Sequence, residues 1–357
     1  MKGVQLLRRI TVFLSALLPL MSGMAEAVVV LQYHHIDNDA PKYISTSPKL
    51  FGEHLGWLKE NGYEVAPLPA IARLIRAGQP LPNNTAVITF DKTSLSIHKN
   101  AFPLLKEYGF PFTIFVDTKA VDKVQHQRQT LNWDQLREMA EAGATLANYT
   151  AKDGHLIERL QGETQVDWLK RIASDIQTAE QRIQEETEQN HKLLAWPFGE
   201  TTTELEQLIL DAGYLGFGQQ PGAIDQLSDK TLLPRFLMAA GYGSMKTFPL
   251  KIQSLPLQVT SMTPDSSLVP KDGNMGKLRI SLKPGEWAAD QVICYAQGSI
   301  LKLEWLDKEK TVFETELPQP LPLGHSDINC TVPAPNGSWF SFSRDFVRLT
   351  RDGLSLD

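Results

Sequence analysis

The sequence predicts an α/β fold with parallel strands, followed by a smaller all-β domain. Apolar runs at 86–90 and 112–116 flank a helical pattern at 101–109, and together they form a strand, helix, strand unit. Strands and helices continue to alternate from about residue 28 to residue 250. After residue 277, short alternating segments separated by Pro and Gly are typical of a β-sandwich.

The first 27 residues have the features of a secretory signal peptide. Basic residues precede an apolar core at 10–21, and Ala25, Glu26 and Ala27 provide a small-residue cleavage site. That core is too short for a membrane span. We therefore expect an exported protein, periplasmic or secreted, with no stable membrane span.

Length, composition and charge give the expected domain organisation and exclude one class of partner. The 357 residues carry a formal net charge of -6 at pH 7, which argues against nucleic acid as a partner and leaves neutral glycans compatible. A stretch rich in Pro, Ser, Asp and Gly lacks helical periodicity and predicts a linker or an extended edge. We expect a signal peptide at 1–27, an α/β domain at 28–253, this linker at 254–276 and a β-sandwich at 277–357.

The two cysteines, Cys294 and Cys330, both fall in the predicted β-sandwich. In an exported protein a structural disulfide is expected rather than a redox or metal site. Closing a loop of this length would stabilise the folded state by about 4 kcal/mol on the chain-entropy model.

Local signals predict the bounds of the other elements. Ser47 and Pro48 are a typical N-cap and first-turn pair, and Asn132 caps a helix that ends at Gly143. Apolar periodicity predicts further helices at 69–77, 164–190 and 205–212. Strands are expected at 28–33, 144–147, 192–195, 214–217 and 233–236, and in the β-sandwich at 278–282, 291–295, 300–305, 311–316, 328–332 and 339–342.

Polar residues that follow the first strands are candidates for a site. In parallel α/β folds the carboxyl ends of the strands face the ligand. Asp91 and Lys92 follow the strand at 86–90, and His34 and His35 follow the strand at 28–33. Side chains alternate along an extended chain, so one of the two histidines is expected to face the site.

Three segments resemble the signatures of the polysaccharide deacetylases, the NodB-like members of carbohydrate esterase family 4. The first signature normally ends in two aspartates, and here it ends in Asp91 and Lys92. Asn148 and Thr150 frame the second, whose two histidine positions hold Tyr149 and Asp153. The third is similar to the turn Trp196, Pro197, Phe198 and Gly199.

The resemblance implies a distorted (β/α) barrel and a role for each matched position. It makes Asp91 the general base, His34 the group that protonates the leaving amine, and the N–H of Phe198 a donor to the oxyanion. We expect substrate contacts from five ring-bearing residues: Tyr33, Trp133, His155, Trp196 and Pro197. For Trp196 and Phe198, a role as core aromatics remains equally open.

The family uses a divalent metal ion such as zinc, bound by an aspartate and two histidines. At those former metal positions this chain has Lys92, Tyr149 and Asp153, so no metal cofactor is expected. An ammonium group has no lone pair, and a neutral phenol is a poor ligand. We hypothesise that Lys92 instead lies between Asp91 and Asp153; the alternative is a lysine on the surface without such partners.

Two functions remain open from the sequence. The favoured one is an exported family member, a pseudoenzyme that binds N-acetylated polysaccharide, or a protein partner, with lost or strongly reduced amide hydrolysis. The alternative is an active polysaccharide N-deacetylase, a hydrolase of non-peptide C–N bonds, with a rebuilt catalytic site. In that case Asp91, Asp153, His155 and His34 would recruit a metal in a new geometry, or Lys92 would act as the electrophile.

Overall fold

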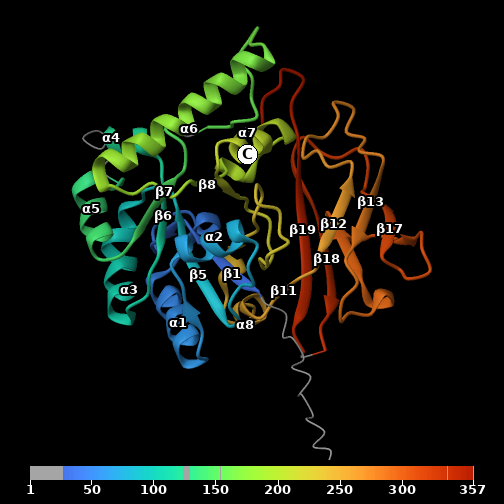
Figure 1. Cartoon of the computed structure of the whole chain (residues 1–357), viewed down its shortest axis with the longest axis horizontal. Helices are drawn as coiled ribbons and strands as arrows, with labels where there is room; N and C mark the ends of the chain where they lie inside the picture. Colours follow the sequence, from blue (N-terminus) through green and yellow to red (C-terminus); the bar gives the residue numbers. More distant parts are fainter. Residues whose placement is uncertain (1–26, 124–128, 153, 336, 357) are drawn as a thin grey trace, which may run out of the picture.

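The computed structural model describes residues 27–123, 129–152, 154–335 and 337–356. Nearly all of the predicted signal peptide, and Asp153, lie outside these ranges. Figure 1 shows an α/β region, coloured blue to yellow, beside a β-rich region in orange and red. This arrangement confirms the predicted fold class. Within the described ranges no helix is both long and apolar enough to cross a membrane.

A parallel sheet forms the centre of the α/β region. Its strand order is β10-β1-β5-β6-β7-β8-β9, and β4 pairs with the first two residues of β5. The strands are β1 (Val28–Tyr33), β4 (Glu64–Val65), β5 (Thr85–Asp91), β6 (Thr113–Val116), β7 (Thr145–Asn148), β8 (Leu193–Ala195), β9 (Leu215–Phe217) and β10 (Phe236–Leu237). β1 and β5 are buried along their whole length, as expected for mainly apolar strands in the centre of a parallel sheet.

Helices surround this sheet (Figure 1). They are α1 (Pro48–Glu60), α2 (Leu68–Ala77), α3 (Phe102–Tyr108), α4 (Thr118–Asp122), α5 (Trp133–Glu141), α6 (Gln165–Thr187), α7 (Thr203–Asp211) and α8 (Phe248–Ile252). The predicted caps are present: the Ser47 side chain accepts from the backbone of Leu50, and Asn132 forms a capping box with Gln135. Gly109 ends α3 with a φ of 67°, in the left-handed region that glycine adopts without strain.

The β-rich region consists of two sheets that share one apolar core. One sheet has the order β11-β19-β18-β14-β15 and the other β12-β13-β17-β16. Their strands are β11 (Leu255–Pro256), β12 (Val259–Thr263), β13 (Lys277–Leu282), β14 (Ile293–Ala296), β15 (Ser299–Ile300), β16 (Glu304–Trp305), β17 (Val312–Glu316), β18 (Gly324–Pro333) and β19 (Trp339–Arg348). Cys294 and Cys330 are paired residues of β14 and β18 and form the predicted disulfide.

The structure decides between two alternatives for this region and corrects one prediction. The range 254–276, predicted as a linker or an extended edge, contains β11 and β12, each at the edge of one sheet. The strand predicted at 300–305 is instead divided between β15 and β16, which belong to different sheets. These short segments become strands by pairing with β19, β13, β14 and β17 rather than through their own periodicity.

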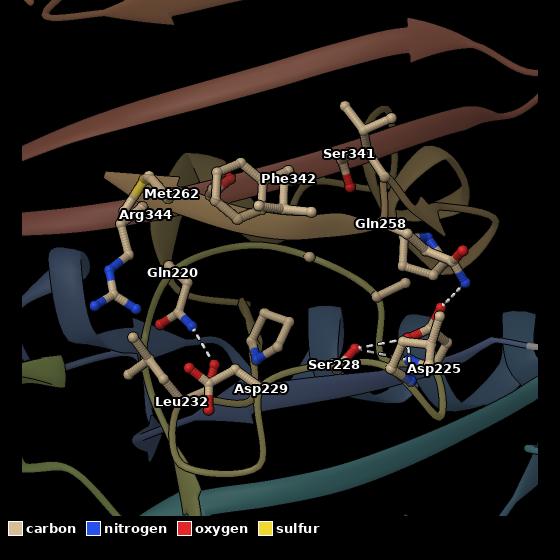
Figure 2. A pocket seen from close by; sticks show the side chains of 18 of the residues that line it. Gln220, Asp225, Ser228, Asp229, Leu232, Gln258, Met262, Ser341, Phe342 and Arg344 are labelled. Carbon is tan, nitrogen blue, oxygen red and sulfur yellow. Dashed lines mark hydrogen bonds between the residues drawn. The ribbon is translucent and has the colours of Figure 1, made fainter. Parts of the chain in front are cut away.

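A cavity of about 390 Å³ lies where the two regions meet (Figure 2). The Arg344 side chain extends into this junction from β19, and one of its Nη atoms is 3.6 Å from a carboxylate oxygen of Glu206 on α7. Burial raises the pKa of Glu206 to about 7; the charge of Arg344 opposes this rise, and Asp229 and Asp265 add to it. The charged form of Glu206 is therefore costly in the folded protein.

Replacing Glu206 with glutamine is expected to make the protein more stable than the wild type at pH 8. The wild-type carboxyl group titrates near 7 when folded and near 4.5 when unfolded, so the unfolded state binds fewer protons between these values. Wild-type stability falls as the pH rises through that window, and the variant escapes this loss, a gain on the order of 1–3 kcal/mol. Urea denaturation at pH 4.5 and pH 8 measures it.

The control for this prediction is Asp211→Asn, because Asp211 is exposed on the same helix. This variant should show the same pH dependence as the wild type. A Glu206→Gln effect of equal size at both pH values would contradict the prediction.

Candidate active site

Asp91 is the last residue of β5 and lies at the carboxyl edge of the parallel sheet, with only 1% of its surface exposed. Arg235, just before β10, donates to both carboxylate oxygens, at 2.5 and 2.8 Å. Gln32 of β1 donates to the carboxylate at 2.8 Å. Three neighbouring strands thus bring together a buried acid, its counter-charge and an amide.

The charges around Asp91 keep it ionised. Burial alone would raise its pKa, but the charge and hydrogen bonds of Arg235, helped by His34 and Gln32, bring the pKa below its ordinary value. A carboxylate with a lowered pKa is a weaker base than a free one.

His34, rather than His35, is the histidine on this side of the chain. The Nε2 atom of His34 is 3.4 Å from the Gln32 amide nitrogen, whereas His35 hydrogen-bonds Ser94 at 2.8 Å. Burial lowers the pKa of His34 to about 4, although the charge of Asp91 opposes the shift. The imidazole of His34 is therefore neutral at pH 7.

Lys92 lies beside aromatic rings. Its backbone has a φ of 64°, in the left-handed region that residues other than Gly, Asn and Asp rarely adopt. The ammonium nitrogen is 5.9 Å from the ring centre of Tyr149 and 5.4 Å from that of Phe198, both within the range of cation–π attraction. Arg235 pairs with Asp91. Asp153, the other partner hypothesised for Lys92, lies outside the described residues, so a position of Lys92 between two carboxylates stays a prediction.

At two of the positions that the family resemblance assigns to a metal ion, Lys92 and Tyr149, the side chains do not suit a divalent metal ion. The ammonium of Lys92 cannot donate an electron pair, and Tyr149 is a phenol with 1% of its surface exposed. Across the described ranges, no group of three or more His, Cys, Asp or Glu side chains is placed to hold a metal ion.

Phe198 and His155 form one wall beside Lys92. Phe198 has a left-handed φ of 57°, and its ring stacks on the imidazole of His155 with 4.1 Å between centres and 15° between planes. Trp196, two residues earlier, is fully buried and its indole nitrogen donates to the carbonyl of Thr231 at 2.7 Å. Of the two alternatives for these aromatics, Trp196 is a core residue, whereas Phe198 is partly exposed.

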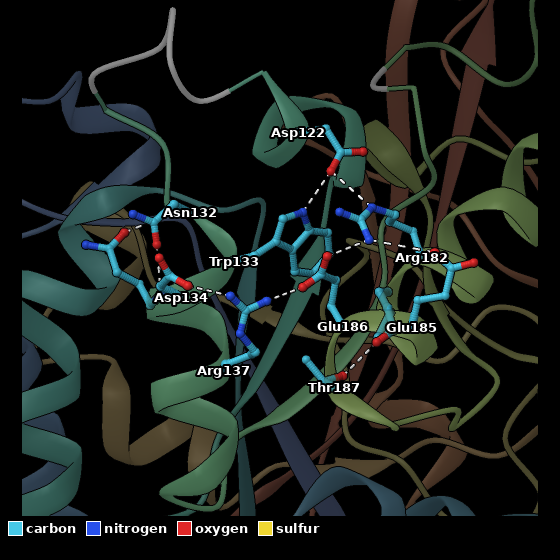
Figure 3. A network of polar contacts seen from close by, with 11 residues as sticks. Asp122, Asn132, Trp133, Asp134, Arg137, Arg182, Glu185, Glu186 and Thr187 are labelled. Carbon is cyan, nitrogen blue, oxygen red and sulfur yellow. Dashed lines mark hydrogen bonds and ion pairs between the residues drawn. The ribbon is translucent and has the colours of Figure 1, made fainter.

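Three other predicted substrate contacts are also buried. Tyr33 is fully buried and its hydroxyl bonds His54 at 3.0 Å; Pro197 is buried beside Trp196. Figure 3 shows Trp133 with its indole N–H directed at Asp122, at 2.7 Å, and the guanidinium of Arg182 is 4.9 Å from its ring centre. The structure therefore corrects the prediction that these residues contact substrate, because their side chains are buried and pack or hydrogen-bond within the fold.

Glu200 joins this wall to the β-rich region. Its buried carboxylate bonds the Nδ1 atom of His155 at 2.7 Å, the Nε2 atom of His325 in β18 at 3.1 Å, and the hydroxyl of Ser355 near the end of the chain. The backbone N–H of Ser355 also donates to Glu158 at 2.7 Å. Figure 1 shows the chain end lying by α7, so the C-terminal residues help to hold His155 in place.

Arg235, Gln32 and Glu200 were not predicted as site residues. One sequence signal could have identified the first two. Arg235 falls within an otherwise apolar run predicted at 233–236, and Gln32 within that at 28–33. A polar side chain inside a buried strand requires a partner, since burying it alone is costly. Glu200 has no such signal, because it follows a turn.

Comparison with known sequences gives one family. Residues 78–217 match the family model described as polysaccharide deacetylase. The poly-β-1,6-N-acetyl-D-glucosamine N-deacetylase of Escherichia coli strain K12 is 24% identical over 258 residues, which are 63% of this chain and 38% of that protein. The protein of that name from Staphylococcus epidermidis is 25% identical over 230 residues, 60% of this chain and 79% of its own length. The chain thus spans well under half of the E. coli protein.

Solved structures give the same fold. The Streptococcus pyogenes deacetylase PplD, in complex with acetate, superposes with a TM-score of 0.54 at 19% identity, covering 61% of this chain and 95% of that one. IcaB from Ammonifex degensii gives a TM-score of 0.52 at 22% identity, covering 63% and 95%. At these identities the likeness concerns the fold, which is the NodB-type (β/α) barrel.

Proposed function

We propose that this protein, whose residues 78–217 match the polysaccharide deacetylase family model, binds N-acetylated polysaccharide at the carboxyl edge of its parallel sheet. We further propose that metal-dependent amide hydrolysis is lost or strongly reduced. The relatives named above act, by their names, on poly-β-1,6-N-acetyl-D-glucosamine, so we take this polymer as the substrate class. The sequence features at 1–27 support export to the periplasm or the exterior.

The observation that carries this proposal is Lys92 beside Tyr149 and Phe198. An ammonium in place of a carboxylate turns attraction for a divalent ion into repulsion of similar size, about 8 kcal/mol at ~4 Å and an effective dielectric constant near 20. Without a metal ion, nothing else among these groups lowers the pKa of a water molecule enough to make it a nucleophile at pH 7.

The same residues suit recognition of an acetamido group. The ammonium of Lys92 has three N–H donors, which suit the acetyl carbonyl oxygen. The stacked rings of Phe198 and His155 offer an apolar surface for a sugar ring or the acetyl methyl group.

The test combines three measurements on the purified chain: metal content, binding of β-1,6-linked N-acetylglucosamine oligomers by calorimetry, and acetate release from the same oligomers. We expect binding with no acetate release and no stoichiometric metal. Lys92→Met should weaken binding about tenfold, because one charge-assisted hydrogen bond is lost. The matched control is Lys119→Met, a lysine exposed on α4.

Two results would contradict the proposal. Stoichiometric zinc together with acetate release would establish the alternative, a polysaccharide N-deacetylase with a rebuilt catalytic site. Failure to bind any oligomer would leave a protein partner as the function of this surface.

A further inference from the structure

Two tyrosines are exposed at the same edge of the sheet as Asp91. Tyr43 has 72% and Tyr242 64% of its surface exposed. Tyr43 lies on the short helix η1 (Lys42–Ile44) and Tyr242 on η5 (Ala240–Gly243), and these two segments contact each other. Single exposed apolar residues are common, whereas exposed apolar groups that gather in one place often mark a binding surface.

The topology places this pair beside the candidate active site. η1 follows the carboxyl end of β1, and η5 follows that of β10. β10, β1 and β5 are consecutive parallel strands, so these segments and Asp91 emerge at one edge. Because neighbouring strands lie ~4.8 Å apart, the backbone of β10 lies roughly 10 Å from that of β5. A short oligosaccharide lying across the strands would span that distance.

The backbone under the tyrosines is held in place. The carbonyl of Tyr242 accepts from the ammonium of Lys251 at 2.6 Å, and that ammonium also lies 5.5 Å from the ring centre of Tyr242. His54 of α1 bonds the carbonyl of Gly243 at 2.5 Å, and the hydroxyl of Thr46, just after η1, donates to the carbonyl of Met238 at 2.6 Å. A ring on a fixed backbone loses little conformational entropy when a ligand covers it.

We propose that Tyr43 and Tyr242 form an aromatic subsite that binds pyranose rings of the polysaccharide, away from the sugar unit held near Lys92. This inference rests on the proposed function. A pyranose ring presents an apolar C–H face, which packs on an aromatic face, and its hydroxyls remain in water. The subsite makes affinity depend on oligomer length, because only a long chain reaches both places.

The experiment compares a dimer with a hexamer of β-1,6-linked N-acetylglucosamine by calorimetry. Tyr43→Ala/Tyr242→Ala should lower hexamer affinity about tenfold or more and leave dimer affinity unchanged. Tyr43→Phe/Tyr242→Phe should retain hexamer binding, since the ring rather than the hydroxyl makes the contact. The matched control is Tyr295→Ala, because Tyr295 is 37% exposed on β14 of the other region.

The outcomes separate the subsite from the proposed function. A wild type that binds both oligomers, with an alanine variant that binds both equally well, overturns the subsite alone. Equal loss of dimer and hexamer binding also overturns it, since the tyrosines would then act at the Lys92 site or on the fold. A wild type that binds neither oligomer overturns both.

Discussion

Replacing Arg235 with methionine is expected to lower the free energy of unfolding by about 3–5 kcal/mol. Arg235 and Asp91 are both fully buried at their side chains, and the guanidinium also donates to the carbonyl of Gly218 at 2.8 Å. The variant leaves the Asp91 charge buried without its counter-ion, and this loss of compensation is the main cost. Urea denaturation at pH 7, followed by tryptophan fluorescence, measures the change.

Two comparisons make this prediction specific. Arg279→Met removes a surface ion pair with Glu314 and should cost about 0–1 kcal/mol. Asp91→Asn/Arg235→Met should be more stable than Arg235→Met alone, because the uncompensated charge is removed. An Arg235→Met variant as stable as Arg279→Met would show that the buried pair is not what holds β5 to β10.

Restoring the three family ligands should restore hydrolysis. Lys92→Asp/Tyr149→His/Asp153→His provides one carboxylate and two imidazoles, the ligand types that zinc prefers. The left-handed backbone at Lys92 suits aspartate better than lysine, so this substitution adds no backbone strain. We expect about one zinc ion per chain and acetate release on the order of 100-fold or more above the background of the assay. Elemental analysis and an acetate assay on the oligomers measure both.

The control keeps the lysine. Tyr149→His/Asp153→His retains the ammonium of Lys92 and is expected to bind no zinc and release no acetate, since the positive charge repels the ion. If this double variant bound zinc as tightly as the triple variant, the ammonium would not be what excludes the metal.

The local features of the fold were predictable from the sequence. The strand at 28–33 is β1 as expected. The caps at Ser47, Asn132 and Gly109 lie at the ends of their helices. These signals act between residues a few positions apart, so they can be recognised in the sequence without knowledge of the fold. The rule that sites lie at strand ends likewise selected Asp91, Lys92 and His34 as candidates from the sequence.

The partners of those residues depend on contacts between distant segments. Arg235 reaches Asp91 across 144 positions, and no local pattern connects them. Trp196 and Phe198 stand two residues apart in one turn, yet one is buried and the other borders Lys92. Their different surroundings come from the elements packed around the turn.

By itself, the sequence determined the order of strands and helices, the disulfide, and the substitutions at the former metal positions, because each depends on residue type and short-range spacing. Only the tertiary structure decided that Arg235 neutralises Asp91 and that Glu200 ties His155 to His325 and Ser355. The physical reason is that a buried charge needs an oppositely charged or hydrogen-bonding partner. Which residue becomes that partner depends on the strand ends that the fold brings together.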